Sequence, residues 1–296
     1  MKMKNLDKLL SPARLSEADW SDLRRIRRES QELGSVSQTS EKYQDDILDA
    51  VYKSAYNGGH IIELGIFRGG LSCQLAYLSK ILGVDCILVD ISQEYCDITI
   101  HLLRQLDLLH ERVRVLAGTV HDLFIQYNCI YGPPAAIVVD ALHTYNGVRI
   151  DICNILAQAP SVPVIGFHDW ALRSDLALRR QSGIAHHVNG VSNAVMDVIG
   201  DSDALHPIGM MGEGKVSIGA ESYDYMEEGY PEGMLLFPEL LDRMAFNIAL
   251  SFCGCFPPDR ACEMQFYAGV QNTFQNSRWI RLGIKLGFLK ETSRYH

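Results

Sequence analysis

The sequence predicts an α/β protein built on a doubly wound, mostly parallel sheet with helical extensions at both ends. Short apolar segments alternate with amphipathic helical segments between residues 60 and 167. A glycine-rich turn joins the first apolar segment to the helix after it. Two later apolar segments end in Asp140 and in His168-Asp169. Ligands of such sheets bind at the carboxyl ends of the strands, so these polar residues mark the expected site.

Composition limits the class of protein. The chain has 296 residues, enough for one large domain with additional segments, and its net charge of −9 argues against a nucleic-acid partner. Its eight cysteines form no CxxC pair, which predicts free thiols in a reducing compartment. The sequence has no apolar run long enough to span a membrane and no apolar signal core. We therefore expect a cytoplasmic protein with no integral membrane segment.

The amino-terminal part is charged, and we expect residues 1–38 to form a helical or lid segment, with a helix over 19–33. A helix is then expected from Ser40 to the glycines at 58–59. We expect a Rossmann-like domain over residues 39–219. Residues 220–296 are expected to form a helical extension whose amphipathic tail favours a homo-oligomer.

Within the domain, five buried parallel strands are predicted, at 60–64, 85–90, 112–117, 135–140 and 162–167. The helical segments between them lie at 70–82, 93–109, 120–128 and 144–158. After Trp170 the pattern predicts helices at 174–181 and 190–199, a hairpin at 206–219, a loop at 220–237 and a last helix at 238–250. The hairpin adds an antiparallel element to the carboxyl-terminal part of the domain.

The glycine turn has features of a cofactor cradle. Gly65 and Gly69 allow a tight turn and a close backbone approach, and Glu63 precedes them at the end of the first strand. Phe67 stands where a dinucleotide-binding turn has its middle glycine. Asp90 ends the second strand about 25 residues after the glycine turn. An acid at this place in nucleotide-binding folds hydrogen-bonds the ribose of the cofactor, and the alternative is that Asp90 caps the next helix.

A second group of polar residues follows the fourth and fifth strands. Asp140, His143, His168 and Asp169 are expected to converge on one edge of the sheet. Buried carboxylates need a partner, so this group predicts a divalent cation or a network with substrate. Two aspartates with water suit Mg²⁺ better than zinc. The alternative is that Asp140 and His143 only cap the next helix.

Together, Glu63-Leu-Gly-Ile-Phe-Arg-Gly-Gly70, Asp90, Asp140-Ala-Leu-His143 and His168-Asp169 resemble class I S-adenosylmethionine-dependent methyltransferases. The likeness is greatest to the metal-dependent sugar O-methyltransferases of macrolide biosynthesis, of the macrocin and mycinamicin type, and to the related cephalosporin-hydroxylase-like group. It covers about residues 40–170. The sequence departs from the macrolide enzymes at His168, where they have a carboxylate.

The resemblance implies S-adenosylmethionine and Mg²⁺ or another divalent cation as cofactors. It implies that His143 is the general base and that the metal ligands are Asp140, His168 and Asp169. The residues expected to contact the methyl donor lie in the first three turns after strands: Glu63, Gly65, Phe67, Arg68, Gly69, Asp90, Ile91, Ser92, Gly118 and Thr119.

The expected activity is O-methyl transfer to a hydroxyl of a sugar, which is either a glycosylated small molecule or a polysaccharide precursor. Metal assistance would lower the pKa of the acceptor hydroxyl, and His143 would accept its proton. Two alternatives remain open at this point. One is an NAD-dependent oxidoreductase on the same sheet, and the other is a non-catalytic protein that binds S-adenosylmethionine or takes part in an assembly.

Overall fold

The computed structural model describes residues 5–35, 37–127, 132–170, 190–200, 203–210, 217–218, 221–222 and 231–241. Residues 1–241 form one compact unit, and 242–296 form a second unit that lies outside the described residues. The helix predicted at 174–181, most of the helix predicted at 238–250 and the amphipathic tail also lie outside them. None of the described helices is long and apolar enough to cross a bilayer.

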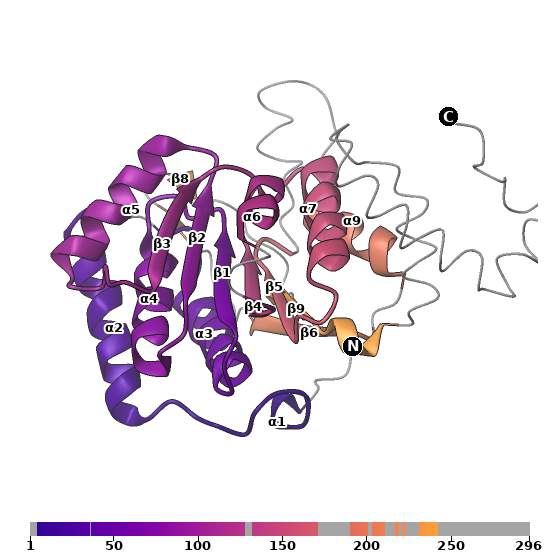
Figure 1. Cartoon of the computed structure of the whole chain (residues 1–296), viewed down its shortest axis with the longest axis horizontal. Helices are drawn as coiled ribbons and strands as arrows, with labels where there is room; N and C mark the ends of the chain where they lie inside the picture. The colour runs from indigo at the N-terminus through magenta and orange to yellow at the C-terminus, as the bar shows by residue number, and fades with distance from the viewer. Residues whose placement is uncertain are drawn as a thin grey trace, which may run out of the picture. The chain divides into compact units, whose positions relative to one another are not determined.

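A seven-stranded sheet forms the centre of the unit, in the order β3-β2-β1-β4-β5-β9-β6 (Figure 1). Its strands are β1 (His60–Leu64), β2 (Cys86–Asp90), β3 (Val113–Ala117), β4 (Pro134–Val139), β5 (Val164–Phe167), β6 (Leu205–Met210) and β9 (Pro231–Leu236). The pairs among β1 to β5 are parallel, and β9 is antiparallel to both of its neighbours. The prediction of a doubly wound, mostly parallel sheet is therefore confirmed.

Helices cover both faces of the sheet. They are α1 (Leu6–Leu9), α2 (Glu17–Glu32), α3 (Glu41–Ala55), α4 (Gly70–Leu82), α5 (Gln93–Gln105), α6 (Val120–Tyr127), α7 (Tyr145–Gln158) and α9 (Gly190–Ile199). Chain direction across the sheet reverses between β3 and β4, so right-handed crossovers place α4 and α5 on one face and α6 and α7 on the other. Helix α3 packs beside α4, and α9 packs beside α7.

The strand order reverses between β1 and β4, and their carboxyl ends are in direct contact. Gly65 follows β1 with φ +85°, and a Cβ at this position would lie 2.2 Å from the carbonyl oxygen of Asp140 after β4. Only glycine fits such a close approach at a positive φ. The glycine turn and the polar group after β4 are therefore neighbours at the point where ligands of such sheets bind.

The described amino-terminal residues pack against the rest of this unit. Leu23 and Ile26 of α2 are buried, and α2 packs against α4. Arg27, also buried, forms an ion pair with Asp45 of α3 and a hydrogen bond with the side chain of Gln74 in α4. Three helices are thus joined by one guanidinium, whose five donors suit such a junction.

The predicted antiparallel element of the sheet is confirmed, but its pairing differs from the hairpin predicted at 206–219. Strand β6 pairs with β9, whereas among the described residues the short strands β7 (Ser217–Ile218) and β8 (Glu221–Ser222) pair with each other. Residues 231–236, predicted as loop, form a buried strand that continues the sheet past the predicted domain boundary at 219. The sequence does not indicate this strand, because it contains Pro231 and Gly233 and both residue types are uncommon in strand interiors.

Substitution of Leu235 tests this correction. Leu235 of β9 is fully buried, whereas Leu240 in the 3₁₀ turn η1 (Pro238–Leu240) is 41% exposed. We expect Leu235→Ala to lower the free energy of unfolding by about 2–5 kcal/mol, because it leaves a cavity in the core. Leu240→Ala should change it by about 0.5 kcal/mol or less. Urea denaturation of both variants measures the difference, and equal small losses would contradict the placement of β9.

Candidate functional site

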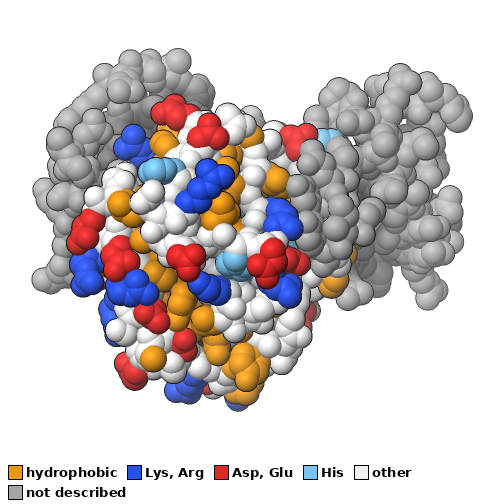
Figure 2. Space-filling view, turned by 60° about the vertical axis from the view of Figure 1, so that its left-hand side comes forward, with side chains coloured by type: hydrophobic (Ala, Val, Ile, Leu, Met, Phe, Trp, Pro, Cys, Tyr) orange, Lys and Arg blue, Asp and Glu red, His pale blue; other side chains and the backbone are white. Residues whose placement is uncertain are grey.

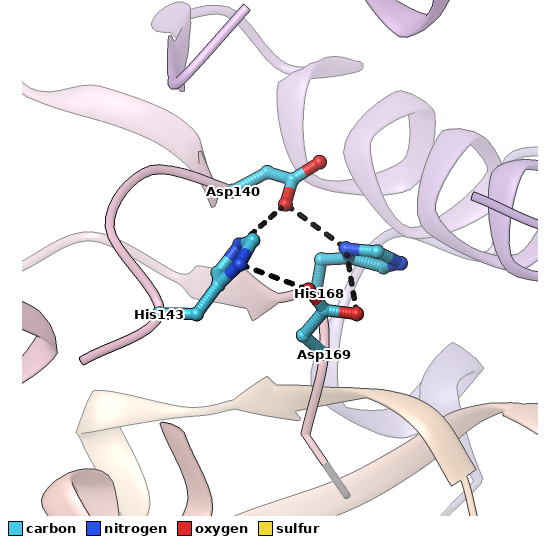
Figure 3. A group of neighbouring side chains, drawn as sticks. All are labelled: Asp140, His143, His168 and Asp169. Carbon is cyan, nitrogen blue, oxygen red and sulfur yellow. Dashed lines mark hydrogen bonds and ion pairs between the residues drawn. The ribbon is translucent and has the colours of Figure 1, made fainter. Parts of the chain in front are cut away.

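Four ionisable side chains meet at the carboxyl edge of the sheet (Figure 3). His143 contacts both aspartates, with Nε2 3.1 Å from Asp140 Oδ1 and Nδ1 3.0 Å from Asp169 Oδ2. Nδ1 of His168 lies 2.9 Å from the same Asp140 oxygen and 3.4 Å from Asp169 Oδ1. One ligand atom from each of the four residues lies within 4.8 Å of the others. The predicted convergence of these residues is therefore present.

Strand register explains the convergence. Strands β4 and β5 are parallel with Val139 opposite Phe167, so Asp140 and His168 leave the sheet at the same level. Thr144, and neither Asp140 nor His143, caps helix α7, by accepting a hydrogen bond from the backbone N–H of Gly147. The structure therefore contradicts the alternative that Asp140 and His143 only cap the next helix.

The cluster has an accessible side and a buried side. The side chains of His143 and Asp140 are 33% and 22% exposed, whereas those of His168 and Asp169 are 1% and 4% exposed. Asp169 also has φ +51°, a left-handed conformation that costs free energy for a residue other than glycine. A ligand that reaches the cluster would meet His143 and Asp140 first.

Proton balance in the cluster favours an added positive charge. Burial disfavours the charged form of His168, yet Asp140, Asp169 and Glu232 outweigh it and raise its pKa well above the usual range. Burial also lowers the pKa of His143, but Asp140 and Asp169 outweigh this effect, so the pKa of His143 is raised. The pKa of Asp140 is lowered by both imidazoles despite its burial. The acids around the two imidazoles thus attract positive charge into the cluster, which a proton or a cation can supply.

The donor set fits a divalent cation. Carboxylate oxygens suit Mg²⁺ and Mn²⁺, and imidazole nitrogens suit zinc, iron and other transition-metal ions. Both nitrogens of His143 and Nδ1 of His168 face carboxylate oxygens, so in a cation-free state protons must separate these atoms. A metal ion takes the place of such protons when it binds, because its ligands must be deprotonated.

Two residues beside the cluster were not predicted. Glu232 of β9 is buried, and its Oε1 lies 3.1 Å from His168 Nε2. Tyr43 of α3 is fully buried, with its ring centroid 4.9 Å from that of His168, and its hydroxyl has no hydrogen-bond partner among the described residues. Burial and the nearby acids raise the pKa of Tyr43. Only strand pairing over more than 60 residues brings Glu232 here, so local sequence carries no signal for it.

Asp90 organises the neighbouring glycine turn. Its Oδ2 accepts hydrogen bonds from the backbone N–H groups of Ile66 at 3.0 Å and Phe67 at 3.1 Å. Its Oδ1 accepts one from the backbone N–H of Ser92, which is the N-cap of α5. Phe67 has φ +45° and packs edge-on against Tyr95, with ring centroids 5.0 Å apart. The acid therefore holds the turn in place from the adjacent strand.

Glu63 lies beneath the turn rather than on its surface. Its side chain is buried and accepts a hydrogen bond of 2.6 Å from the hydroxyl of Ser72 in α4. Burial raises its pKa to about 8, with Asp140 and Asp90 adding to the effect and Ser72 opposing it. Glu63 is thus a buried acid that favours its protonated form near neutral pH.

The other residues expected at the methyl donor occupy two places. Ile91 is 80% exposed after β2, and Gly118 after β3 donates its N–H to the carbonyl oxygen of Asp90. Thr119 is hydrogen-bonded to Asp122 in α6. Arg68 instead lines a groove of about 430 Å³ with residues from α5 and the end of α2, namely Leu33, Gly34, Asp97, Ile98, His101 and Leu102.

No protein-family model matches the sequence, and no curated protein matches it. Solved structures that are similar include an O-methyltransferase from Bacillus cereus in complex with SAH, with 14% identity over 79% of this chain and 100% of that chain and a TM-score of 0.48. The O-methyltransferase TomG from Streptomyces achromogenes, in complex with SAM, has 15% identity over 79% and 99% and a TM-score of 0.43.

An rRNA methylase from Streptococcus thermophilus is similar at 12% identity over 68% of this chain and 98% of that chain, with a TM-score of 0.40. Similarity at these identities and TM-scores carries no argument about activity. The activity of this chain must therefore be argued from its own residues.

The raised pKa of Glu63 predicts how stability varies with pH. Between its usual pKa of 4.5 and about 8, the folded protein binds a proton that the unfolded chain has released. The contribution of Glu63 to stability therefore falls as pH rises through this range. Glu63→Gln keeps an oxygen for Ser72 and cannot ionise. Relative to the unaltered protein, the variant should gain up to about 1.4 kcal/mol in free energy of unfolding per pH unit.

Urea denaturation from about pH 5 to about pH 8, in the presence of a chelator, measures this difference. If the two proteins have parallel stability curves, Glu63 is ionised in the folded state and the expected linkage is absent.

Proposed function

We propose that this protein is an S-adenosylmethionine-dependent O-methyltransferase that acts on a hydroxyl of a sugar or glycosylated small molecule with the help of a divalent cation. The observation that carries the proposal is the cluster of Asp140, His143, His168 and Asp169 directly beside the glycine turn. One half suits a methyl donor, and the other suits an acceptor hydroxyl that must lose a proton.

The charge of the turn supports a cationic donor over a dinucleotide. A dinucleotide fold offers turn N–H groups to an anionic pyrophosphate. Here the N–H groups of Ile66 and Phe67 already donate to the carboxylate of Asp90. An acid at that place repels a pyrophosphate and attracts the sulfonium and ammonium groups of S-adenosylmethionine. The NAD-dependent alternative is therefore disfavoured.

Methyl transfer is an in-line displacement at the sulfonium carbon, so the enzyme must align the acceptor oxygen and receive its proton. His143 is suited to receive it, because it is the more exposed imidazole of the cluster. Asp140 and Asp169 contact its two ring nitrogens. One of these nitrogens would become available as a base when its carboxylate binds the cation instead, and a proton that His143 then accepts would be stabilised by the carboxylate that stays at the other nitrogen.

Asp140, His168 and Asp169 would hold the cation. Once bound, a divalent cation would neutralise these carboxylates and lower the pKa of both the acceptor hydroxyl and His143. Vicinal sugar hydroxyls are a suitable acceptor because two oxygens can approach the cation side by side. Acidic and basic side chains are interspersed over the face in Figure 2, so that face offers no basic patch to an anionic partner.

Activity of site variants tests the assigned roles. We expect His143→Ala to lower the rate of transfer from labelled S-adenosylmethionine to a panel of sugars about 10²–10⁴-fold, the usual contribution of a general base. Calorimetry should find S-adenosylmethionine binding retained and NAD binding absent. The control is His110→Ala, which changes a histidine that contacts the carbonyl oxygen of Ala76 away from the cluster. Full activity of His143→Ala would remove His143 from the mechanism.

Metal removal tests the cation separately. We expect EDTA treatment to abolish transfer and added Mg²⁺ or Mn²⁺ to restore it, because Asp140, His168 and Asp169 would then hold a cation again. Full activity in EDTA would leave methyl transfer in place and refute the metal. Cofactor binding without turnover on any hydroxylated acceptor would instead favour a non-catalytic binding protein.

A further inference from the structure

We propose that Glu232 is a positioning residue that fixes the tautomer of His168 and thereby directs the Nδ1 lone pair of this imidazole at the cation. The proposal rests on the metal site of the proposed function. It assigns a role to a residue of β9 that lies one side chain behind the cluster. The chemical class of ligand is a divalent cation, and Glu232 acts on it only through His168.

The two nitrogens of His168 have different surroundings. Nε2 lies 3.1 Å from Glu232 Oε1, and Nδ1 lies 2.9 Å from Asp140 Oδ1. A neutral imidazole has one N–H and one lone pair. If the proton were on Nδ1, the Nε2 lone pair would face a buried carboxylate. With the proton on Nε2, that nitrogen donates to Glu232, and the lone pair on Nδ1 is free for a cation between Asp140 and Asp169.

Glu232 is itself held in a fixed place. Its side chain is 4% exposed, and Oε1 accepts a hydrogen bond of 2.7 Å from the backbone N–H of Ser40. Oε2 accepts a second bond from the hydroxyl of Ser40, the N-cap of α3. The backbone of Glu232 is fixed as well, because its carbonyl oxygen accepts the N–H of Trp170 at 2.9 Å. Because the side chain and the backbone of Glu232 are both fixed, Glu232 can fix the orientation of the His168 ring that donates to it.

The packing around His168 leaves its ring little freedom. Tyr43 stacks at a tilt against it, and the same tyrosine fills space that glycines leave open in β6 and β9. A Cβ at Gly233 would lie 2.2 Å from Tyr43 Cε2, and one at Gly209 would lie 2.9 Å from Tyr43 Cβ. His168 is therefore confined by an aromatic ring on its face and by carboxylates at both nitrogens.

Histidine ligands of metals commonly donate their second ring nitrogen to a carboxylate, which fixes the tautomer and raises the basicity of the ligand. This arrangement also bears on the histidine at position 168. The pair of His168 and Glu232 brings the charge of a carboxylate to this corner of the cluster without placing a third carboxylate oxygen on the cation. The buried glutamate is then part of the metal site although it does not contact the metal.

Binding of Mn²⁺, followed by the loss of the free-ion electron paramagnetic resonance signal, tests the role. We expect Glu232→Ala to weaken Mn²⁺ binding about 10–100-fold, the usual effect of removing such a partner. Glu232→Gln keeps an acceptor oxygen for His168 and should restore most of the affinity. The matched control is Asp46→Ala, which breaks a similar tie between a helix and a strand, the 2.9 Å hydrogen bond from Gly209 N–H, without touching the cluster.

A second measurement needs no variant. In two-bond ¹H–¹⁵N spectra of the full chain with Mg²⁺, we expect His168 to be protonated at Nε2 and unprotonated at Nδ1. A proton on Nδ1, or equal Mn²⁺ affinity in Glu232→Ala and the unaltered protein, overturns the proposal and leaves the proposed function standing. If the unaltered protein binds no Mn²⁺, the metal site of the proposed function fails and the role of Glu232 falls with it.

Discussion

The contact between the ends of β1 and β4 is the constraint on which the site depends. Gly65 can approach the backbone of Asp140 only because it has no side chain and tolerates a positive φ. This contact brings the turn that would hold a methyl donor next to the cluster that would hold an acceptor. A methyl group is small, so donor and acceptor atoms must lie within a few ångströms for the in-line geometry to be reached.

Charge repulsion is the second constraint, and the two halves of the site share it. Asp90, Asp140, Asp169 and Glu232 all lie at or near one edge of the sheet, and Glu63, buried below it, favours its protonated form. Uncompensated buried carboxylates cost free energy. The protein limits this cost through backbone N–H donors at Asp90, a hydroxyl at Glu63 and imidazoles at Asp140. Positively charged ligands would lower the remaining free-energy cost, so the carboxylates that destabilise the fold are also those that would attract the ligands.

Sequence alone predicted the parts of the structure that have local signals. Helix α4 begins and ends at the predicted residues because Gly69 and Gly83 flank it in left-handed conformations. Asp140, His143, His168 and Asp169 were predicted to converge because each follows a strand of one parallel sheet. The pairing of β6 was missed, since its partner β9 contains a proline and a glycine and lies more than 20 residues further on. Glu232 and Tyr43 were missed for the same reason: only tertiary packing brings them to His168.

The position of β9 in the sheet also bears on how the chain folds during synthesis. Strand β9 lies between β5 and β6, although it is made after both of them. Until residues 231–236 emerge, β5 has an unpaired edge and β6 has no neighbour in the sheet. Exposed strand edges and apolar surface are what chaperones protect in partly made chains. The nascent protein is therefore open to wrong pairing at β5 in the interval before β9 is inserted, and insertion of β9 is also the step that brings Glu232 to His168.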